Sequence, residues 1–471
     1  MGEFESISVL WPLFWLVTRE MLLLAALGII LFGLDELFID AVYLWTRTRR
    51  ALTIYRRYGR WTAMDVPRAV EPGRMAIFLP AWDEADVIGR MLSQLLATLD
   101  HGNYRLFAGV YANDPATLAA VEAVRDSRIE IVVSPRAGPT TKADCLNALW
   151  AAMRADEAAS GVRYKAIVLH DAEDVVHPAE LAVFDHLIPR KAMVQLPVVP
   201  LPDPDSRWIS GHYLDEFAET HRKTMVAREA LGAALPSAGV ACAFERGALG
   251  EIADVRGGAP FDPDSLTEDY ELGMTMSRGG RGAFVRLPDS ERGAAVATRE
   301  HFPADFEAAL RQKTRWLTGI AFQGWDRLRW RGGLADKYML LRDRKPAPNA
   351  LFILLAYLGA LLFAGAQLAV WLGLTPAAMP PVVEPGSALS RLILVTTALL
   401  VWRLATRFCF TAADHGLWEG FMSLPRALVA NVIAILAARR ALAQYAGLVF
   451  RGRRLVWHKT AHRYPGDGAG D

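Results

Sequence analysis

Residues 350–374 contain no charged side chain. A helix needs about 20 mostly apolar residues to cross the hydrocarbon core of a bilayer. Buried helices of soluble proteins are rarely this long and this free of charge. The segment therefore predicts a membrane-spanning helix, and the fold must place the rest of the chain around it.

Two other segments are predicted to cross the bilayer. Residues 21–45 are mostly apolar and lack the small-residue cleavage pattern of a signal peptide, so they predict an uncleaved anchor. Residues 389–410 hold arginines near their ends, where long side chains can reach the headgroups. The charged residues that need an explanation are Asp35, Glu36 and Asp40 in the first segment and Arg391, Arg403 and Arg407 in the second.

Residues 424–450 are also apolar but carry internal arginines. Arg426, Arg440 and Gln444 fall on one face of a helix with α-helical periodicity. A helix with a polar face lies more easily in the membrane interface than across the bilayer. We therefore expect an interfacial helix here and about three crossings in the whole chain.

Basic residues give the orientation. They gather at 47–60, at 342–345 and at 451–459, whereas the proline-rich loop between the second and third predicted spans has almost no charge. By the positive-inside rule the large segment between the first two spans and the C-terminus are cytoplasmic. The predicted organisation is a membrane anchor and basic linker (1–60), a soluble domain (61–345), a membrane region (346–450) and a basic tail (451–471).

The soluble segment alternates strand-like and helical stretches. Strands are predicted at 75–79, 106–111, 129–133 and 166–169, and helices at 85–99, 116–126 and 142–153. This order predicts an α/β domain with a mostly parallel sheet that is covered on both faces. Ligands of such sheets bind beyond the carboxyl ends of the strands. The chain has 52 Lys and Arg against 51 Asp and Glu, so its net charge gives no argument for nucleic-acid binding.

Polar residues follow each predicted strand. Asp83 and Asp114, taken singly, could be helix caps or turn residues, and Lys142 could be a solvated lysine in a first helical turn. The sequence His-Asp-Ala-Glu-Asp at 170–174 is harder to explain structurally, because crowded carboxylates repel one another unless a cation compensates. Hard oxygen ligands of this kind suit Mg²⁺ or Mn²⁺ bridging phosphates.

Two later motifs complete the pattern. Thr267-Glu268-Asp269 opens a helical stretch, and a helix cap alone could explain it. Gln312, Arg315 and Trp316 share one helix face, which offers an amide, a guanidinium fork for phosphate and a flat ring for a sugar. An amphipathic helix at the membrane surface is the alternative interpretation of that face.

In this order the motifs resemble the membrane-bound family 2 glycosyltransferases with a GT-A catalytic domain, a group that includes cellulose, hyaluronan and poly-N-acetylglucosamine synthases. The chain is most similar to the NfrB-like bacteriophage-adsorption branch. That similarity rests on Gly-Pro-Thr-Thr-Lys-Ala-Asp-Cys-Leu-Asn (138–147), His-Asp-Ala-Glu-Asp-Val-Val-His-Pro (170–178) and Trp-His-Lys-Thr (457–460). It extends from the first predicted span to residue 460.

The resemblance implies roles for the matching positions. Asp171 and Glu173 match the acidic pair that holds Mg²⁺ or Mn²⁺ on the donor diphosphate, and Asp269 matches the general base. Around the uridine the matches are Asp83, Glu84 and Asp114, and beside the nucleotide they are Lys142 and Asp144. On the face that grips the diphosphate and the acceptor end they are Glu268, Gln312, Arg315 and Trp316. A C-terminal latch is matched by Trp457, Lys459 and Thr460.

The resemblance further implies an inverting, metal-dependent transfer of a hexose or N-acetylhexosamine from a UDP-sugar to a growing cell-surface polysaccharide at a bacterial inner membrane. Two alternatives stay open. One is transfer of a single sugar to a polyprenyl phosphate lipid, because three spans give little wall for a channel unless an export partner protein supplies it. The other is an idle membrane receptor or scaffold that keeps the fold.

Overall fold

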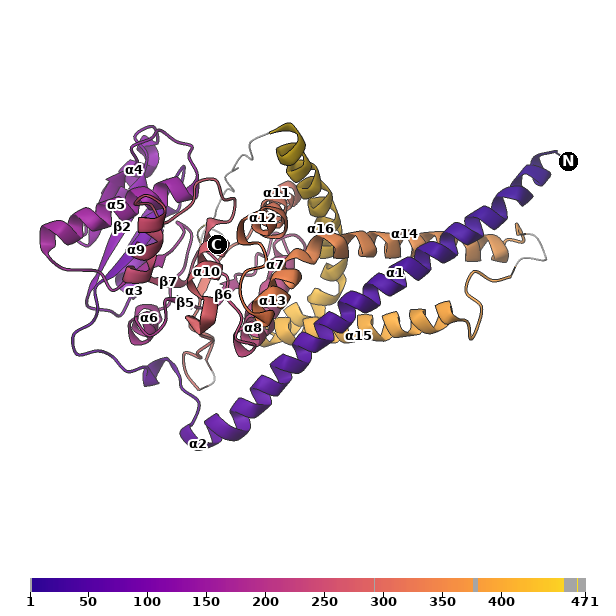
Figure 1. Cartoon of the computed structure of the whole chain (residues 1–471), viewed down its shortest axis with the longest axis horizontal. Coiled ribbons are helices and arrows are strands. Elements are labelled where there is room, and N and C mark those ends of the chain that lie inside the picture. The colour runs from indigo at the N-terminus through magenta and orange to yellow at the C-terminus, as the bar shows by residue number, and fades with distance from the viewer. Residues whose placement is uncertain (1, 292, 376–379, 453–463, 465–471) are drawn as a thin grey trace.

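The computed structural model describes residues 2–291, 293–375, 380–452 and 464. An α/β domain lies at one end and a set of long helices extends from it (Figure 1). The first and third of the predicted parts of the chain thus meet in space, because the N-terminal helix runs alongside helices from the C-terminal third.

A seven-stranded sheet forms the centre of the α/β domain, in the order β3-β2-β1-β4-β7-β5-β8. Its strands are β1 (Met75–Pro80), β2 (Tyr104–Val110), β3 (Ile129–Val133), β4 (Ala166–Leu169), β5 (Met193–Gln195), β7 (Cys242–Glu245) and β8 (Gly282–Phe284). All pairs are parallel except those of β7, which runs antiparallel to β4 and β5. The four predicted strands and their mostly parallel pairing are confirmed.

A second, two-stranded sheet pairs β6 (Val198–Pro200) with β9 (Thr298–Glu300) in parallel. The helices around the sheets are α3 (Ile88–Thr98), α4 (Pro115–Glu122), α5 (Lys142–Ser160), α6 (Glu180–Leu187), α7 (Gly211–Glu219), α8 (Met225–Ala230), α9 (Arg246–Val255) and α10 (Glu268–Met276). The helix predicted at 85–99 begins only at Ile88, because a turn occupies the residues before it and the Val87 amide bonds the Glu84 carbonyl.

The core lies on both faces of the sheet. Along β1, Met75, Ile77 and Leu79 belong to one buried cluster, and Ala76 and Phe78 to the other. Successive side chains of a strand point to opposite faces, so an uninterrupted apolar strand is buried on both sides. This explains why the sequence of β1 shows no alternation of polar and apolar residues.

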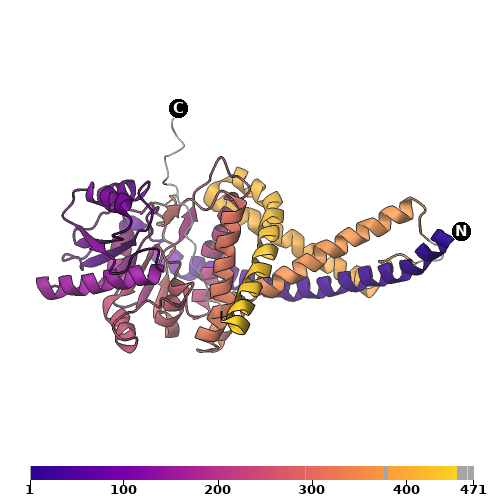
Figure 2. The same cartoon turned by 90° about the horizontal axis from the view of Figure 1, so that it is seen from above.

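Four described helices are long and apolar enough to cross a membrane. They are α1 (Gly2–Arg49), α14 (Pro346–Trp371), α15 (Ala388–His415) and α16 (Leu417–Arg451). The first three run together away from the α/β domain, whereas α16 lies across their direction in both views (Figures 1 and 2). At the far end, the indole of Trp11 donates to the Leu374 carbonyl and that of Trp15 to the Pro380 carbonyl, which ties α1 to the α14–α15 connection.

The polar face predicted for residues 424–450 contacts the α/β domain. The fully buried Arg426 bonds Asp215 of α7, Arg440 bonds Glu307 of α11 (Phe306–Leu317), and Gln444 accepts from the Thr318 hydroxyl. The apolar side chains on the rest of α16 are exposed, among them Leu417, Trp418, Phe421, Leu428, Val432, Leu442, Val449 and Phe450. The helix therefore separates a polar, domain-facing side from an apolar, outward side.

Two of the arginines of α15 pair with acids of the α/β domain. Arg407 pairs with Asp215 at 2.9 Å and Arg403 pairs with Glu219, so the two side chains in the half of this helix nearer the α/β domain bind acids of α7. Burial of such a pair is tolerated because each charge has its counterion.

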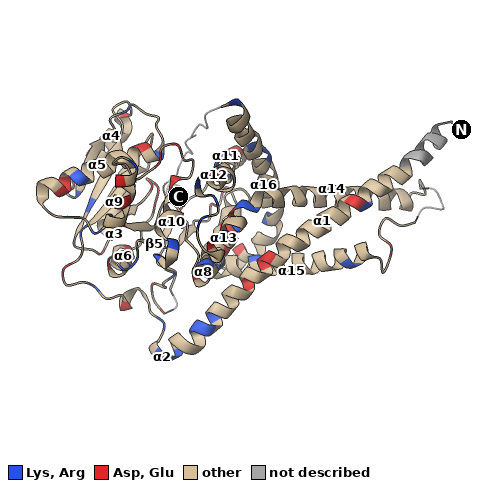
Figure 3. Cartoon of the chain, viewed as in Figure 1, with Lys and Arg blue, Asp and Glu red and all other residues tan. Residues whose placement is uncertain are grey.

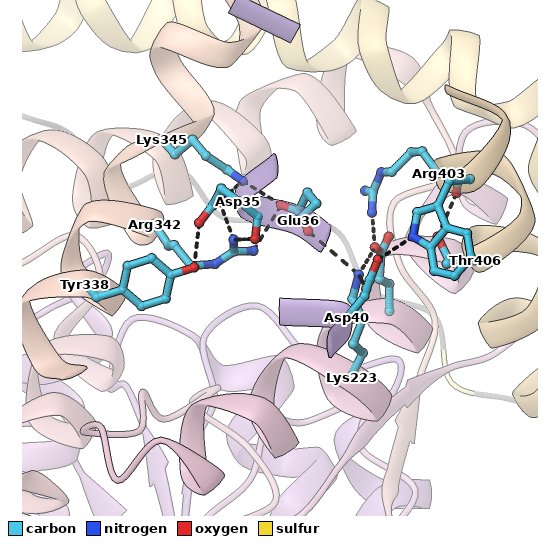
Figure 4. A network of polar contacts seen from close by, with 11 residues as sticks. Asp35, Glu36, Asp40, Lys223, Tyr338, Arg342, Lys345, Arg403 and Thr406 are labelled. Carbon is cyan, nitrogen blue, oxygen red and sulfur yellow. Dashed lines mark hydrogen bonds and ion pairs between the residues drawn. The ribbon is translucent and has the colours of Figure 1, made fainter. Parts of the chain in front are cut away.

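The three acids of the first predicted span, Asp35, Glu36 and Asp40, also have partners (Figure 4). Lys223 is 1% exposed and binds Asp40 at 2.8 Å and Glu219 at 2.7 Å. Asp35 accepts from the Tyr338 hydroxyl of α13 (Leu334–Arg344), and Lys345 bonds both Asp35 and Glu36 at 2.5 Å. The acids that weakened the prediction of the first span thus join α1 to the α/β domain, to α13 and to α15.

Candidate functional site

A cavity of about 390 Å³ opens where β1, β2 and β4 end. Its size is within the range of small-molecule sites. Nine residues predicted for the site line it, namely Glu84, Lys142, Asp171, Glu173, Glu268, Asp269, Gln312, Arg315 and Trp316. They come from segments spread over about half of the chain. The residues after the strands meet because the carboxyl ends of parallel strands lie at one edge of the sheet, and the helices α10 and α11 bring the others to that edge.

One end of the cavity has aromatic walls that the sequence analysis did not single out. The rings of Trp82 and Tyr111 meet edge to face with centroids 5.0 Å apart, and both residues line the cavity. A Cβ at Gly138 would lie 2.2 Å from the Trp82 ring, so only glycine fits there. Asn113 holds Gly138 in place through bonds to its amide (2.8 Å) and its carbonyl (2.7 Å). A flat base would find ring surface at this end.

Three predicted nucleotide residues support this end and are not among the lining side chains. Asp114 caps α4 by accepting from the Thr117 amide, and it also accepts from the Asp83 amide at 2.6 Å. Asp83 has a positive φ of 57°, a conformation that Asp tolerates better than most residues. Asp144 forms a capping box with Thr141 at the start of α5. The helix-cap role that the sequence left open for Asp114 is therefore present, and Asp144 has a capping role that the sequence analysis did not consider.

Lys142 lies at the centre of the charged region. Its Nζ is 2.5 Å from Oδ1 of Asp171. Burial works against its charged form, but the carboxylates of Asp171, Glu268 and Asp269 outweigh burial and raise the pKa of the ammonium group. Lys142 is therefore a cation shared between the end of β4 and the start of α10, and it is not a solvated surface lysine.

Glu300, at the end of β9, is another residue of the site that sequence reasoning missed. Burial and the nearby carboxylates of Asp174, Glu173 and Asp171 raise its pKa well above the usual range. Because β9 follows a long irregular stretch, no sequence pattern predicted that its end lies beside the end of β4. The only signal was an acid directly after a short β-prone run.

A divalent cation fits the chemistry of this acidic group, since it would compensate the repulsion between Asp171, Glu173 and Glu300. Within the described part of the chain, however, no three His, Cys, Asp or Glu side chains already converge as a metal site. These acids therefore match a divalent cation in their charge and in their oxygen donors, while in this structure the Asp171 carboxylate contacts Lys142.

His170 holds the acidic segment 170–174, which follows β4, in place through two hydrogen bonds. The imidazole is fully buried between Asp174 (2.7 Å) and Glu180 (2.6 Å), and Glu180 also accepts from the Thr298 hydroxyl of β9 at 3.3 Å. Burial disfavours its charge, but the two carboxylates outweigh burial and raise its pKa to about 10. These bonds tie the end of β4 to β9.

Glu268 and Asp269 open α10 as predicted. Thr267 stands at the N-cap position but its side chain makes no capping bond, whereas Oδ1 of Asp269 accepts from the Tyr270 amide at 2.7 Å. Burial and the neighbouring Asp269 raise the pKa of Glu268 to about 7, and burial raises the pKa of Asp269 as well. Carboxylates with raised pKa values in a cavity are suited to accept protons near neutral pH.

The predicted face of α11 reaches the same place. Gln312, Arg315 and Trp316 all line the cavity. Arg315 donates to the Leu266 carbonyl at 3.4 Å, and no carboxylate pairs with it among the described residues. The Oε1 atom of Gln312 is buried and has no hydrogen-bond partner within the described chain. The alternative of a plain membrane-surface helix does not explain this placement.

The predicted latch of Trp457, Lys459 and Thr460 lies outside the described residues. Of the C-terminal segment the structure describes Tyr464, whose buried hydroxyl donates to Gln94 of α3 at 2.6 Å.

Comparison with known proteins gives the family. Residues 72–319 match the family described as Glycosyltransferase like family 2. The chain is 37% identical over 468 residues to bacteriophage adsorption protein B of Escherichia coli K12 and to bacteriophage N4 adsorption protein B of Escherichia coli O157:H7. Each alignment covers 93% of this chain but 61% of the relative, so the chain spans less than two thirds of their length.

Among solved structures, the mannosyltransferase PcManGT from Pyrobaculum calidifontis, in complex with GDP-Man and Mn²⁺, has a similar fold. The TM-score is 0.51 at 17% identity, and the match covers 86% of this chain and 99% of that one. This similarity agrees with the expected GT-A arrangement of the sheet and helices.

Proposed function

The chain belongs to the family 2 glycosyltransferases, and from this membership we propose that it transfers a hexose or N-acetylhexosamine from a UDP-sugar to a growing cell-surface polysaccharide. The observation that carries the proposal is the shared cavity of Lys142, Asp171, Glu268, Asp269 and Arg315. In that cavity Lys142 and Arg315, which suit a diphosphate, lie near carboxylates with raised pKa values.

In this proposal the nucleotide lies at the end of the cavity near Trp82 and Tyr111. Its uridine is held by the segment of Asp83, Glu84 and Asp114, and Lys142 and Asp144, in the first turn of α5, lie beside the nucleotide. Asp171 and Glu173 hold Mg²⁺ or Mn²⁺. When bound, that ion supplies positive charge to the departing diphosphate. The Mn²⁺ of the mannosyltransferase with the similar fold is in keeping with this choice.

The remaining steps use residues of this chain. Arg315, without a carboxylate partner in the described chain, is available to neutralise charge on the leaving diphosphate, a contribution that is usually large. Asp269 takes the proton of the attacking acceptor hydroxyl, assisted by the neighbouring Glu268. Attack from the face opposite the diphosphate inverts the anomeric carbon.

Gly239 offers a test of how closely Asp269 is positioned. It has a φ of +80°, and a Cβ there would lie 2.4 Å from Oδ2 of Asp269. We expect Gly239→Ala to displace this carboxylate and to lower turnover at least tenfold. The matched control is Gly232→Ala, which has a similar φ of +74° and no atom within 4 Å of the added Cβ. If both variants lose turnover equally, the loss comes from strain at a residue with positive φ, and not from displacement of the Asp269 carboxylate.

We also propose that α1, α14 and α15 cross a bacterial inner membrane, with α16 in its cytoplasmic interface and the α/β domain in the cytoplasm. The exposed apolar side of α16 and its polar contacts to the domain support this arrangement. Lys and Arg gather along the end of α1 and over α13 and α16, while α14 has no charged residue (Figure 3). This is the distribution expected of cytoplasmic helix ends.

Reporter fusions test the topology. A reporter inserted near residue 380 should be active outside the cytoplasm, and one at residue 465 should be active inside. An extracytoplasmic signal at 465 would mean that α16 crosses the bilayer. The reporter in the loop at 257, within the α/β domain, serves as the cytoplasmic reference.

Two alternatives predict other results. If the acceptor is a polyprenyl phosphate, each lipid receives one sugar, and a product-length assay separates this outcome from polymer growth. A phosphate acceptor is already ionised and would not use the raised pKa of Glu268 and Asp269. An idle receptor or scaffold would release no UDP. If the product is a polymer, three spans give little wall for a channel, and an export partner protein would supply the rest.

The deciding experiment incubates the purified membrane protein with a panel of UDP-sugars and with Mn²⁺ or Mg²⁺, and measures nucleotide release. GDP-mannose belongs in the panel because the mannosyltransferase of similar fold binds it. Metal-dependent UDP release from one donor supports the proposal. Release of GDP alone would change the donor, and no release from any donor would favour the idle scaffold.

A further inference from the structure

The cavity has a second half, beyond Asp269, that the predicted motifs do not explain. It is bounded by α7, by the π-helical segment η3 (Thr220–Thr224) and by α8, and it includes Glu216, Phe217 and Phe302 beside Trp316. Irregular π-helical turns are frequent at functional sites. This half lies where the acceptor would approach the base.

Its wall is aromatic and rigid. The Phe302 ring packs on Phe217 with centroids 4.7 Å apart and stacks on Tyr213 at 4.6 Å. Trp316 contacts the same group, with its centroid 6.2 Å from that of Phe217. Because these rings hold one another, Phe217 and Trp316 present fixed apolar faces to the cavity, which suit the C–H face of a pyranose.

Glu216 also lines this half of the cavity, and Lys313 pairs with it from behind the lining. Oε2 of Glu216 is 2.5 Å from Nζ of Lys313, and the Glu216 side chain is 46% exposed whereas that of Lys313 is 13% exposed. The ammonium also lies over the rings of Tyr213 (4.4 Å) and Trp316 (4.7 Å), so its position is fixed. Oε1 of Glu216 accepts from no donor in the described chain and is available for hydroxyl groups.

The charges in this half are paired. Asp343 binds the guanidinium of Arg228 with two bonds of 2.8 and 2.9 Å, and Lys313 neutralises Glu216. Burial lowers the pKa of His221 to about 4, so this imidazole is neutral at physiological pH. Arg315, which has no carboxylate partner in the described chain, belongs to the donor half. A lipid phosphate would therefore bring an uncompensated negative charge into this half, which is costly.

We propose that Glu216 and Lys313, with Phe217 and Trp316, form an acceptor subsite for an uncharged saccharide, and that it binds the sugar unit next to the one that reacts. Glu216 accepts hydrogen bonds from the hydroxyls of that unit, Lys313 holds the carboxylate in place, and the rings cover its apolar face. The inference rests on the proposed glycosyl transfer and names the class of its acceptor.

Binding is tested without turnover. Saturation-transfer NMR on the full-length protein in detergent, with UDP and Mn²⁺, would probe neutral tetrasaccharides of β-1,4-linked glucose and β-1,4-linked N-acetylglucosamine, with undecaprenyl phosphate in parallel. We expect at least one tetrasaccharide to bind. Glu216→Gln and Lys313→Met should each weaken that binding about tenfold or more, because a hydrogen bond to a charged group is lost or misplaced. UDP affinity should change less than twofold.

Arg311→Met is the matched control, because Arg311 lies on the same helix, is half-exposed and pairs with Glu307 instead of Glu216. It should bind the tetrasaccharide as the wild type does. Lack of binding of both tetrasaccharides, tetrasaccharide binding unchanged in both variants, or competition by undecaprenyl phosphate alone would overturn the proposal. Failure of the proposed transfer is a separate result, since it appears as absent nucleotide release while NMR still reports the saccharide.

Discussion

Asp269→Asn is expected to bind the nucleotide donor like the wild type and to lower turnover by about 10²–10⁴-fold, the usual contribution of a general base. The substitution preserves the shape of the side chain, and an asparagine oxygen can still accept from the Tyr270 amide as Oδ1 does now. The variant loses the group that accepts the acceptor proton. Burial already raises the pKa of this carboxyl, which matches the role.

The measurement is UDP affinity, turnover and thermal stability on the same preparation. Asp86→Asn makes the same chemical change at an exposed residue that does not line the cavity, so it should leave all three unchanged. If Asp269→Asn turns over within a few-fold of the wild type while UDP still binds, Asp269 serves only to begin α10. A loss of thermal stability in this variant alone would also favour that structural role.

Four of the seven strands of the main sheet were predictable because they are short apolar runs, whereas β5, β7 and β8 were not predicted. Residues 129–133 and 166–169 are β3 and β4 with the same bounds, and the polar residues after each strand gather at one edge as the parallel order requires. Gln312, Arg315 and Trp316 were predictable for a similar local reason, since three and four residues complete one helical turn.

Residues whose roles depend on long-range packing could not be predicted. Glu300 reaches the acidic group because β9 pairs with β6 in a second sheet, and no local pattern encodes that pairing. Likewise, Lys142 could not be distinguished from a solvated lysine until α5 and β4 were placed together. The internal acids of the first predicted span, such as Asp35, could be explained only once α13 was placed beside α1.

The second large effect is expected at Asp171. Asp171→Ala should abolish the strengthening of UDP binding by Mn²⁺ and lower turnover by at least about 10²-fold, because it removes a ligand of the proposed cation and thereby the charge that stabilises the leaving diphosphate. Removing the metal from the wild type with a chelator should give the same UDP affinity as the variant with Mn²⁺ present. Asp254→Ala, at an exposed position outside the cavity, is the control.

The ion pair between Lys142 and Asp171 offers a competing explanation, in which Asp171 only positions the lysine. Lys142→Met separates the two. If Asp171 is a metal ligand, Lys142→Met weakens UDP binding but leaves Mn²⁺ able to strengthen it, whereas Asp171→Ala loses that dependence. If Asp171 acts only through Lys142, the two variants weaken UDP binding alike and both still respond to Mn²⁺. The second pattern would remove Asp171 from the metal site and leave Glu173 and Glu300 as the acids to test next.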